Sequence, residues 1–150
     1  MNSVATSVSS ITTVLLIISG AGALKQILID SGVSDYIGAL LHGSQISPLI
    51  LAWLIATIIR VCVGSATVAG LTAAGIVLPL ISNSDVSPEL MVLAIGSGSL
   101  MLSHVNDAGF WMFKEYFNLS VKETLSTWTV METIVGITGL VGVLILNIFI

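Results

Sequence analysis

Long stretches without charge are the feature that most restricts how this chain can fold. Residues 4–24, 61–84 and 90–106 contain no Lys, Arg, Asp or Glu, and residues 124–150 contain only Glu132. A helix needs about 20 consecutive apolar residues to cross the hydrocarbon core of a bilayer. The stretches therefore predict an all-α integral membrane protein that lies in the lipid bilayer.

The low charge content also excludes several classes of protein. Only 8% of the 150 residues are charged, whereas a soluble domain carries about a quarter. This excludes an ordinary soluble enzyme and a disordered tail, and the absence of a basic face excludes a nucleic-acid binder. The sequence contains no visible nucleophile–base pair and no metal-ligand spacing. We therefore expect no enzymatic activity, no metal and no cofactor.

Capping signals place the starts of three helices. Ser47-Pro48 and Ser87-Pro88 each put a hydroxyl before a proline at the first helical position. Ser120 has Glu123 at the spacing of a capping box. We therefore expect helices to begin near residues 48, 88 and 121. These signals and the uncharged stretches divide a single transmembrane domain into a span at 4–24, an amphipathic helix at 26–42, a hairpin at 48–82, a broken helix at 88–117 and a span at 121–150.

The hairpin is predicted because residues 48–82 are too long for one helix and too short for two full spans. Gly64-Ser65-Ala66-Thr67 lies in the middle and would form a tight polar tip. We favour a re-entrant hairpin whose tip is buried near the middle of the membrane. Two short crossing helices joined by a small-residue turn are the alternative. Ala66, Gly70 and Ala74 have the small-xxx-small spacing that lets a returning helix pack closely.

The broken helix is predicted from a polar interruption. Residues 103–109 are mostly polar or small and separate two apolar runs, of which the second is too short to span a membrane by itself. Irregular backbone at membrane depth is tolerated only where it is buried in protein or lines a cavity. We therefore expect one discontinuous helix that is unwound over residues 103–109.

A hairpin tip and a helix break together predict a binding site. Each exposes the N-terminus of a half-helix, where unpaired N–H groups and the helix dipole favour an anion. Discontinuous helices near mid-membrane commonly form the substrate sites of secondary transporters. The candidate substrate-binding residues are Gly64, Ser65, Ala66, Thr67, Ser103 and Asn106.

Four ionisable residues at membrane depth have open roles. Asp107 is a candidate for proton coupling, and it could equally cap the following half-helix. His104 is a second proton-coupling candidate, although a packed histidine bonded to a backbone carbonyl is favoured. Arg60 either provides a counter-charge for the substrate or, as we slightly favour, pairs with a carboxylate elsewhere in the protein. For Glu132 we favour snorkelling or a structural hydrogen bond.

Several segments resemble the gluconate permease family. The resemblance extends from about residue 4 to the end of the chain and is most specific in Ser103-His-Val-Asn-Asp-Ala-Gly109 and the residues that follow it, to Asn118. Residues 20–32, 64–70 and 87–91 also match. The family often has proline where this chain has Ala108. The resemblance implies a multi-pass inner-membrane protein of the ion-transporter superfamily, with two inverted repeats that each contain a re-entrant hairpin and a broken helix.

The resemblance also implies a function and an incomplete chain. Family members are proton-coupled symporters for gluconate and related sugar acids, and they are longer; this chain is similar to their C-terminal part alone. We expect a C-terminal repeat that works with protons, a gluconate-like organic anion and the missing N-terminal half of the permease. A fragment, a truncated reading frame and a split subunit are all open. The alternatives in function are another small organic anion, such as D-serine or a short hydroxy acid, and a non-transporting membrane fragment or assembly module.

Overall fold

The computed structural model describes residues 46–82 and 86–150, together with Thr12, Ser19, Ala23, Gln26, Ile27 and residues 30–32. The predicted span at 4–24 and the amphipathic helix at 26–42 lie outside the described residues, apart from these isolated positions. All regular secondary structure in the described residues is helical. The predicted all-α class is therefore confirmed.

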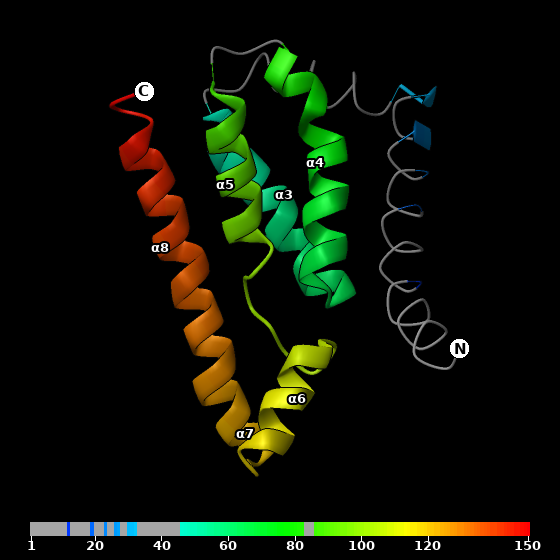
Figure 1. Cartoon of the computed structure of the whole chain (residues 1–150), viewed down its shortest axis with the longest axis vertical. Helices are drawn as coiled ribbons and strands as arrows, with labels where there is room; N and C mark the ends of the chain where they lie inside the picture. The colour runs from blue at the N-terminus through cyan, green and yellow to red at the C-terminus, as the bar shows by residue number, and fades with distance from the viewer. Residues whose placement is uncertain are drawn as a thin grey trace, which may run out of the picture.

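Seven helical segments follow one another in the described ranges (Figure 1). The segments are α3 (Pro48–Val63), α4 (Ala66–Ser82), α5 (Pro88–Gly98), α6 (Ala108–Tyr116), α7 (Val121–Thr124), the π-helical turn η1 (Leu125–Thr129) and α8 (Val130–Leu146). From α7 to α8 the helical run is continuous over 26 residues, and it is the one described helix long and apolar enough to cross a membrane. At about 1.5 Å per residue, α3, α4 and α5 are each shorter than the hydrocarbon core.

The three predicted helix starts are confirmed, and the caps explain two of them. The Ser87 hydroxyl accepts a hydrogen bond from the Leu90 N–H. Ser120 and Glu123 form the predicted reciprocal capping box. The expected cap at Ser47 is wrong, because its side chain makes no capping hydrogen bond. There the helix start depends on Pro48, whose ring fixes a helical φ and whose missing N–H needs no partner.

Removal of the Ser120 cap is expected to weaken the start of the long helix. Ser120→Ala loses the hydroxyl that accepts from the Glu123 N–H, and loss of such a cap costs about 1 kcal/mol. Thermal unfolding in detergent would measure the change. Ser126→Ala is the matched control, because this exposed hydroxyl bonds only to a carbonyl of its own helix. Equal unfolding temperatures for the two variants would contradict the assigned cap.

Small residues let the helices approach closely. In the core, α3 packs against both α4 and α5, and α5 packs against α8 (Figure 1). A Cβ at Gly136 of α8 would overlap the Met101 side chain, and one at Gly139 would overlap Ser97. The Trp53 indole N–H on α3 donates to the Gly136 carbonyl at 3.1 Å. The N-terminal half of α8 is thereby held against α5 and α3. This contact places residues 128–136 near the segment that follows α5.

The opposite surface of α8 is apolar. Large side chains that are well exposed lie along its length: Ile134, Ile137, Val141 and Ile145. A continuous apolar surface on a helix of this length suits hydrocarbon better than water. α8 therefore has one face that packs against the protein and one apolar face that the described residues leave uncovered.

Two interruptions of the helices lie next to each other. α3 and α4 run antiparallel and are joined by Gly64 and Ser65 alone, and α5 and α6 are separated by the irregular residues 99–107 (Figure 1). The predicted unwound segment was 103–109. The observed one starts four residues earlier, at residue 99, and ends two residues earlier, at residue 107. α6 begins at Ala108 because Asp107 caps it. The candidate functional site is formed where the hairpin tip meets this segment.

Candidate functional site

The tip of the hairpin touches the irregular segment at backbone distance. Gly64 has φ +78°, a left-handed conformation that favours glycine. A Cβ at Gly64 would overlap the backbone carbonyl of Asn106. Only glycine therefore satisfies both the turn and the contact at this position.

The end of α3 is bonded by side chains of the irregular segment. The last carbonyls of a helix have no partner within it. The Val61 carbonyl accepts a hydrogen bond from the Asn106 amide at 2.9 Å, and the His104 Nε2 lies 3.3 Å from the same oxygen. His104 is thus a packed histidine against a backbone carbonyl, the role that the sequence favoured.

Arg60 and Asp107 form an ion pair between the two interruptions. The Arg60 side chain is 2% exposed, and its Nη2 lies 2.5 Å from the Asp107 Oδ2. The Arg60 Nη1 donates to the Gly64 carbonyl at 2.5 Å. Among the described residues the buried Arg60 Nε has no hydrogen-bond partner. Arg60 therefore pairs with a carboxylate of this chain and binds the hairpin tip at the same time.

Asp107 is the N-cap of α6 as well as the partner of Arg60. Its Oδ1 accepts the Gly109 N–H at 2.9 Å, and its Oδ2 also accepts the Ser103 hydroxyl. Both carboxylate oxygens are thus occupied. The capping interpretation of Asp107 is confirmed, and the second N–H of α6, that of Gly109, is already bonded to this carboxylate.

Ser103 links this pair to the long helix. Its side chain is buried, and its oxygen accepts the Trp128 indole N–H at 2.7 Å. The Thr129 hydroxyl donates to the Ser103 carbonyl. Trp128 and Thr129 were not among the residues predicted for the site. A tryptophan N–H in a membrane segment needs a partner, but nothing in the sequence indicated that the partner would be Ser103.

The remaining predicted site residues lie at the start of α4. The Ser65 hydroxyl accepts the Val68 N–H at 3.3 Å. The N–H groups of Ala66 and Thr67, at the first turn of α4, make no hydrogen bond with any described residue. Thr67 is exposed. This helix end therefore keeps two free donors and a hydroxyl.

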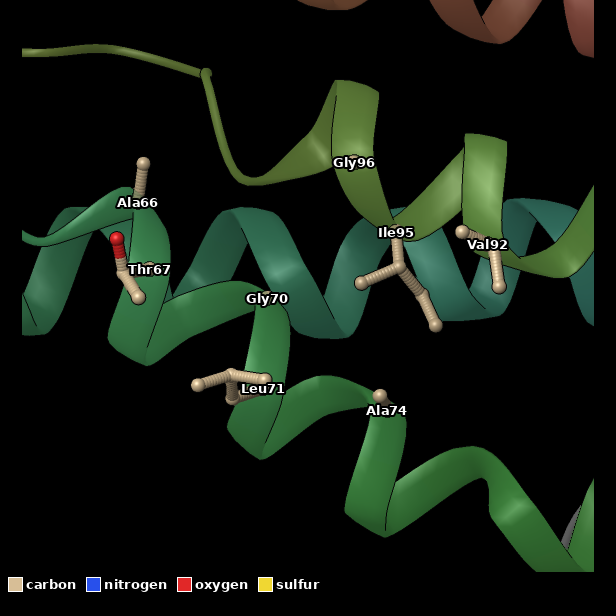
Figure 2. Close-up of a pocket in the computed structure, with 8 residues that line it drawn as sticks. All are labelled: Ala66, Thr67, Gly70, Leu71, Ala74, Val92, Ile95 and Gly96. Carbon is tan, nitrogen blue, oxygen red and sulfur yellow. The ribbon is translucent and has the colours of Figure 1, made fainter. Parts of the chain in front are cut away.

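A groove of about 450 Å³ leads away from these donors between α4 and α5 (Figure 2). Figure 2 shows Ala66 and Thr67 at one end of the groove, with Leu71, Ala74, Ile95 and Val92 farther along it. Thr67 carries the one polar side chain of the lining. A Cβ at Gly70 would reach only ordinary contact distance from Ser99. The predicted small-residue row on α4 thus lines an open groove and makes no backbone-close contact with α5.

A comparison of the whole chain with known families decides its family. A family model described as "GntP family permease" matches residues 1–149. The chain belongs to the GntP permease family.

Individual relatives agree with this assignment. The chain is 57% identical to the "High-affinity gluconate transporter" of Escherichia coli (strain K12) over 94% of this chain and 32% of that protein. It is 57% identical to the "Gluconate permease" of Bacillus subtilis (strain 168), over 98% of this chain and 33% of that protein. It is 54% identical to the "Gnt-II system L-idonate transporter" of Escherichia coli (strain K12), over 98% of this chain and 34% of that protein. No solved structure matches the chain.

The chain spans about a third of the length of the relatives it matches. The expected family is thus confirmed, and the family model and these relatives are named as permeases or transporters. Among the described residues, no cluster of three or more His, Cys, Asp or Glu side chains could hold a metal ion. The site of this GntP permease segment consists of an ion pair, two free backbone donors and an adjoining apolar groove.

Proposed function

We propose that this chain is one part of a secondary transporter that moves gluconate or a closely related sugar acid across the inner membrane together with protons. The names of the relatives support the substrate class, since they specify gluconate and L-idonate. The observation that carries the proposal is the meeting of the hairpin tip with residues 99–107 around the buried Arg60–Asp107 pair. Because the chain spans a third of its relatives, the complete site includes groups from the rest of the permease.

The substrate carboxylate is proposed to bind at the start of α4. The free N–H groups of Ala66 and Thr67 and the Thr67 hydroxyl are donors there, and the positive end of the helix dipole favours an anion. The N-terminus of α6 is less suitable, because Asp107 already occupies the Gly109 N–H. Ser103 is buried and fully bonded, so its proposed role is to hold Asp107. Arg60 has the same positioning role rather than direct contact with the substrate.

The proposed membrane arrangement follows from helix length and backbone satisfaction. α3 and α4 are about 25 Å long at 1.5 Å per residue, less than the roughly 30 Å of the hydrocarbon core. We propose that they form a re-entrant hairpin, that α5 and α6 are two halves of a discontinuous helix, and that α7–α8 spans the membrane. Residues 99–107 then lie at membrane depth, where surrounding protein must cover their irregular backbone. In this arrangement the chain is one repeat of an inverted pair.

Removal of the Thr67 hydroxyl is expected to weaken binding of the substrate. Thr67→Val keeps the side-chain shape and loses one hydrogen bond of about 1 kcal/mol, so the KM for gluconate should rise about fivefold. The test uses a chimeric permease in which residues 1–150 replace the matching third of a full-length gluconate permease, expressed in cells that lack gluconate uptake. Initial uptake rates of labelled gluconate give KM and kcat separately.

Thr138→Val is the matched control, because this exposed threonine of α8 bonds only to its own helix. Competition by unlabelled L-idonate and D-serine distinguishes the substrate classes. Preference for D-serine would replace the sugar acid by an amino acid, and the absence of any uptake by the wild-type chimera would refute a transport role for this segment.

A further inference from the structure

Glu132 lies on the face of α8 that contacts the site. Residues three and four apart share one face of a helix. Trp128 and Thr129, one turn before Glu132, bond to Ser103. Gly136, one turn after it, packs against Met101 and accepts the Trp53 N–H. Glu132 is therefore held between two contacts that fix this face of α8 against the irregular segment and α3, and its side chain is partly buried.

Two charged groups lie close enough to Glu132 to act on it electrostatically. These are Arg60, from α3, and Asp107, from the irregular segment. His104, the other titratable group of that segment, is engaged with the Val61 carbonyl. α5 contributes Glu89 alone, at its far end, and η1 contributes no titratable group. The two helices that precede η1 also carry charged groups. On α6, Lys114 pairs with Glu115, and on α7 the capping box holds Glu123, next to Lys122.

The charges around Glu132 do not balance. Arg60 is the one cation near it in the described part of the chain, and Arg60 is paired with Asp107. The Glu132 carboxylate makes no hydrogen bond or ion pair with any described residue. The group thus holds two carboxylates for one guanidinium, and an uncompensated charge at membrane depth is unfavourable. A proton on the second carboxylate would remove the imbalance.

We propose that Glu132 is the group that binds the co-transported proton. The carboxylate takes a proton from one side of the membrane to form a neutral carboxylic acid and releases it on the other side as the carboxylate returns. Asp107 is less suited to this task, because it would have to give up Arg60 and the Ser103 hydroxyl to become protonated. The inference rests on the proposed transport function and names the residue that couples it to protons.

Glu132→Gln in the chimeric permease tests the assignment. Glutamine keeps the size of the side chain and cannot titrate. We expect accumulation of labelled gluconate driven by a pH gradient to be lost, so that the internal concentration only equals the external one. Counterflow, the exchange of labelled for unlabelled gluconate at equal pH on both sides, should persist, because no net proton movement is needed. Glu115→Gln is the matched control, since this exposed carboxylate on α6 should leave both assays unchanged.

Each outcome bears on one of the two proposals. Gluconate accumulation by Glu132→Gln at the wild-type level would overturn the proton-binding role and leave the transport function standing. Loss of counterflow together with accumulation, with normal amounts of protein in the membrane, would also overturn it by showing that Glu132 is needed for passage of the substrate. Absence of uptake and counterflow in the unsubstituted chimera would instead refute the transport function.

A second variant, Glu132→Asp, tests the proposal even if Glu132→Gln folds poorly. Glu132→Asp keeps a titratable carboxylate in a shorter side chain, so accumulation should persist while the pH dependence of uptake moves along the pH axis. An Asp variant with the wild-type pH profile would contradict the proposal, because the titrating group would then lie elsewhere.

Discussion

Asp107→Asn is expected to destabilise the permease strongly, although asparagine preserves the shape of the side chain and caps helices about as well as aspartate. The reason is Arg60, which is 2% exposed and would be left without its counter-charge. Breaking a buried ion pair by removing one partner costs about 3–5 kcal/mol. We expect a sharp fall in the amount of folded protein in the membrane and in its thermal unfolding temperature in detergent.

Removing both charges should restore much of this stability. In Arg60→Met/Asp107→Asn no buried charge is left unpaired, and the long methionine side chain fills part of the volume of Arg60. The matched control for the single substitution is Asp30→Asn, where an exposed aspartate loses its bond from Gln26, the one bond that it makes with a described residue. A double variant that is less stable than Asp107→Asn alone, or a single variant as stable as the wild type, would show that the ion pair does not hold the two segments together.

Features that depend on neighbouring residues were predictable from the sequence. The helix starts at Pro88 and Val121 follow from the serine caps just before them, and the start at Pro48 follows from the proline itself. The turn at Gly64 follows from a glycine in the middle of an apolar stretch. The capping role of Asp107 was one of two predicted possibilities for the same reason, since it depends on the two residues after it.

Features that depend on residues far apart in the chain were not predictable. Arg60 and Asp107 are separated by 47 positions, and the sequence left the partner of Arg60 open. The contact of Trp128 with Ser103 requires the glycines of α8 to bring that helix against α5. The position of Glu132 on the face of α8 that contacts the site depends on the same approach, and for this residue the sequence favoured snorkelling or a structural hydrogen bond.

The hairpin tip should tolerate no side chain larger than hydrogen at residue 64. Alanine at Gly64 carries two separate costs. The left-handed φ of +78° costs an L-residue about 1–2 kcal/mol, and the overlap of Cβ with the Asn106 carbonyl adds about 1–3 kcal/mol of overpacking. Because the added Cβ would overlap backbone atoms of Asn106, a side-chain rotation cannot relieve the overlap. The hairpin tip would have to move away from residues 99–107.

Such a movement would reach the whole site. The bonds of Asn106 and His104 to the Val61 carbonyl and the bond from Arg60 to Gly64 all cross the same contact. We therefore expect Gly64→Ala to lower the unfolding temperature of the chimeric permease and to abolish gluconate uptake, including counterflow. The loss of counterflow distinguishes it from Glu132→Gln, for which exchange should persist.

Gly32→Ala separates the two costs. Gly32 has a nearly identical φ of +72°, but a Cβ there would meet no atom of a described residue within 4 Å. This variant should therefore show only the backbone cost of about 1–2 kcal/mol and should keep gluconate uptake. Equal losses of stability in the two variants would mean that the glycine at residue 64 is required by the turn alone. A larger loss at Gly64 would mean that the contact between the hairpin tip and the irregular segment is itself what the glycine protects.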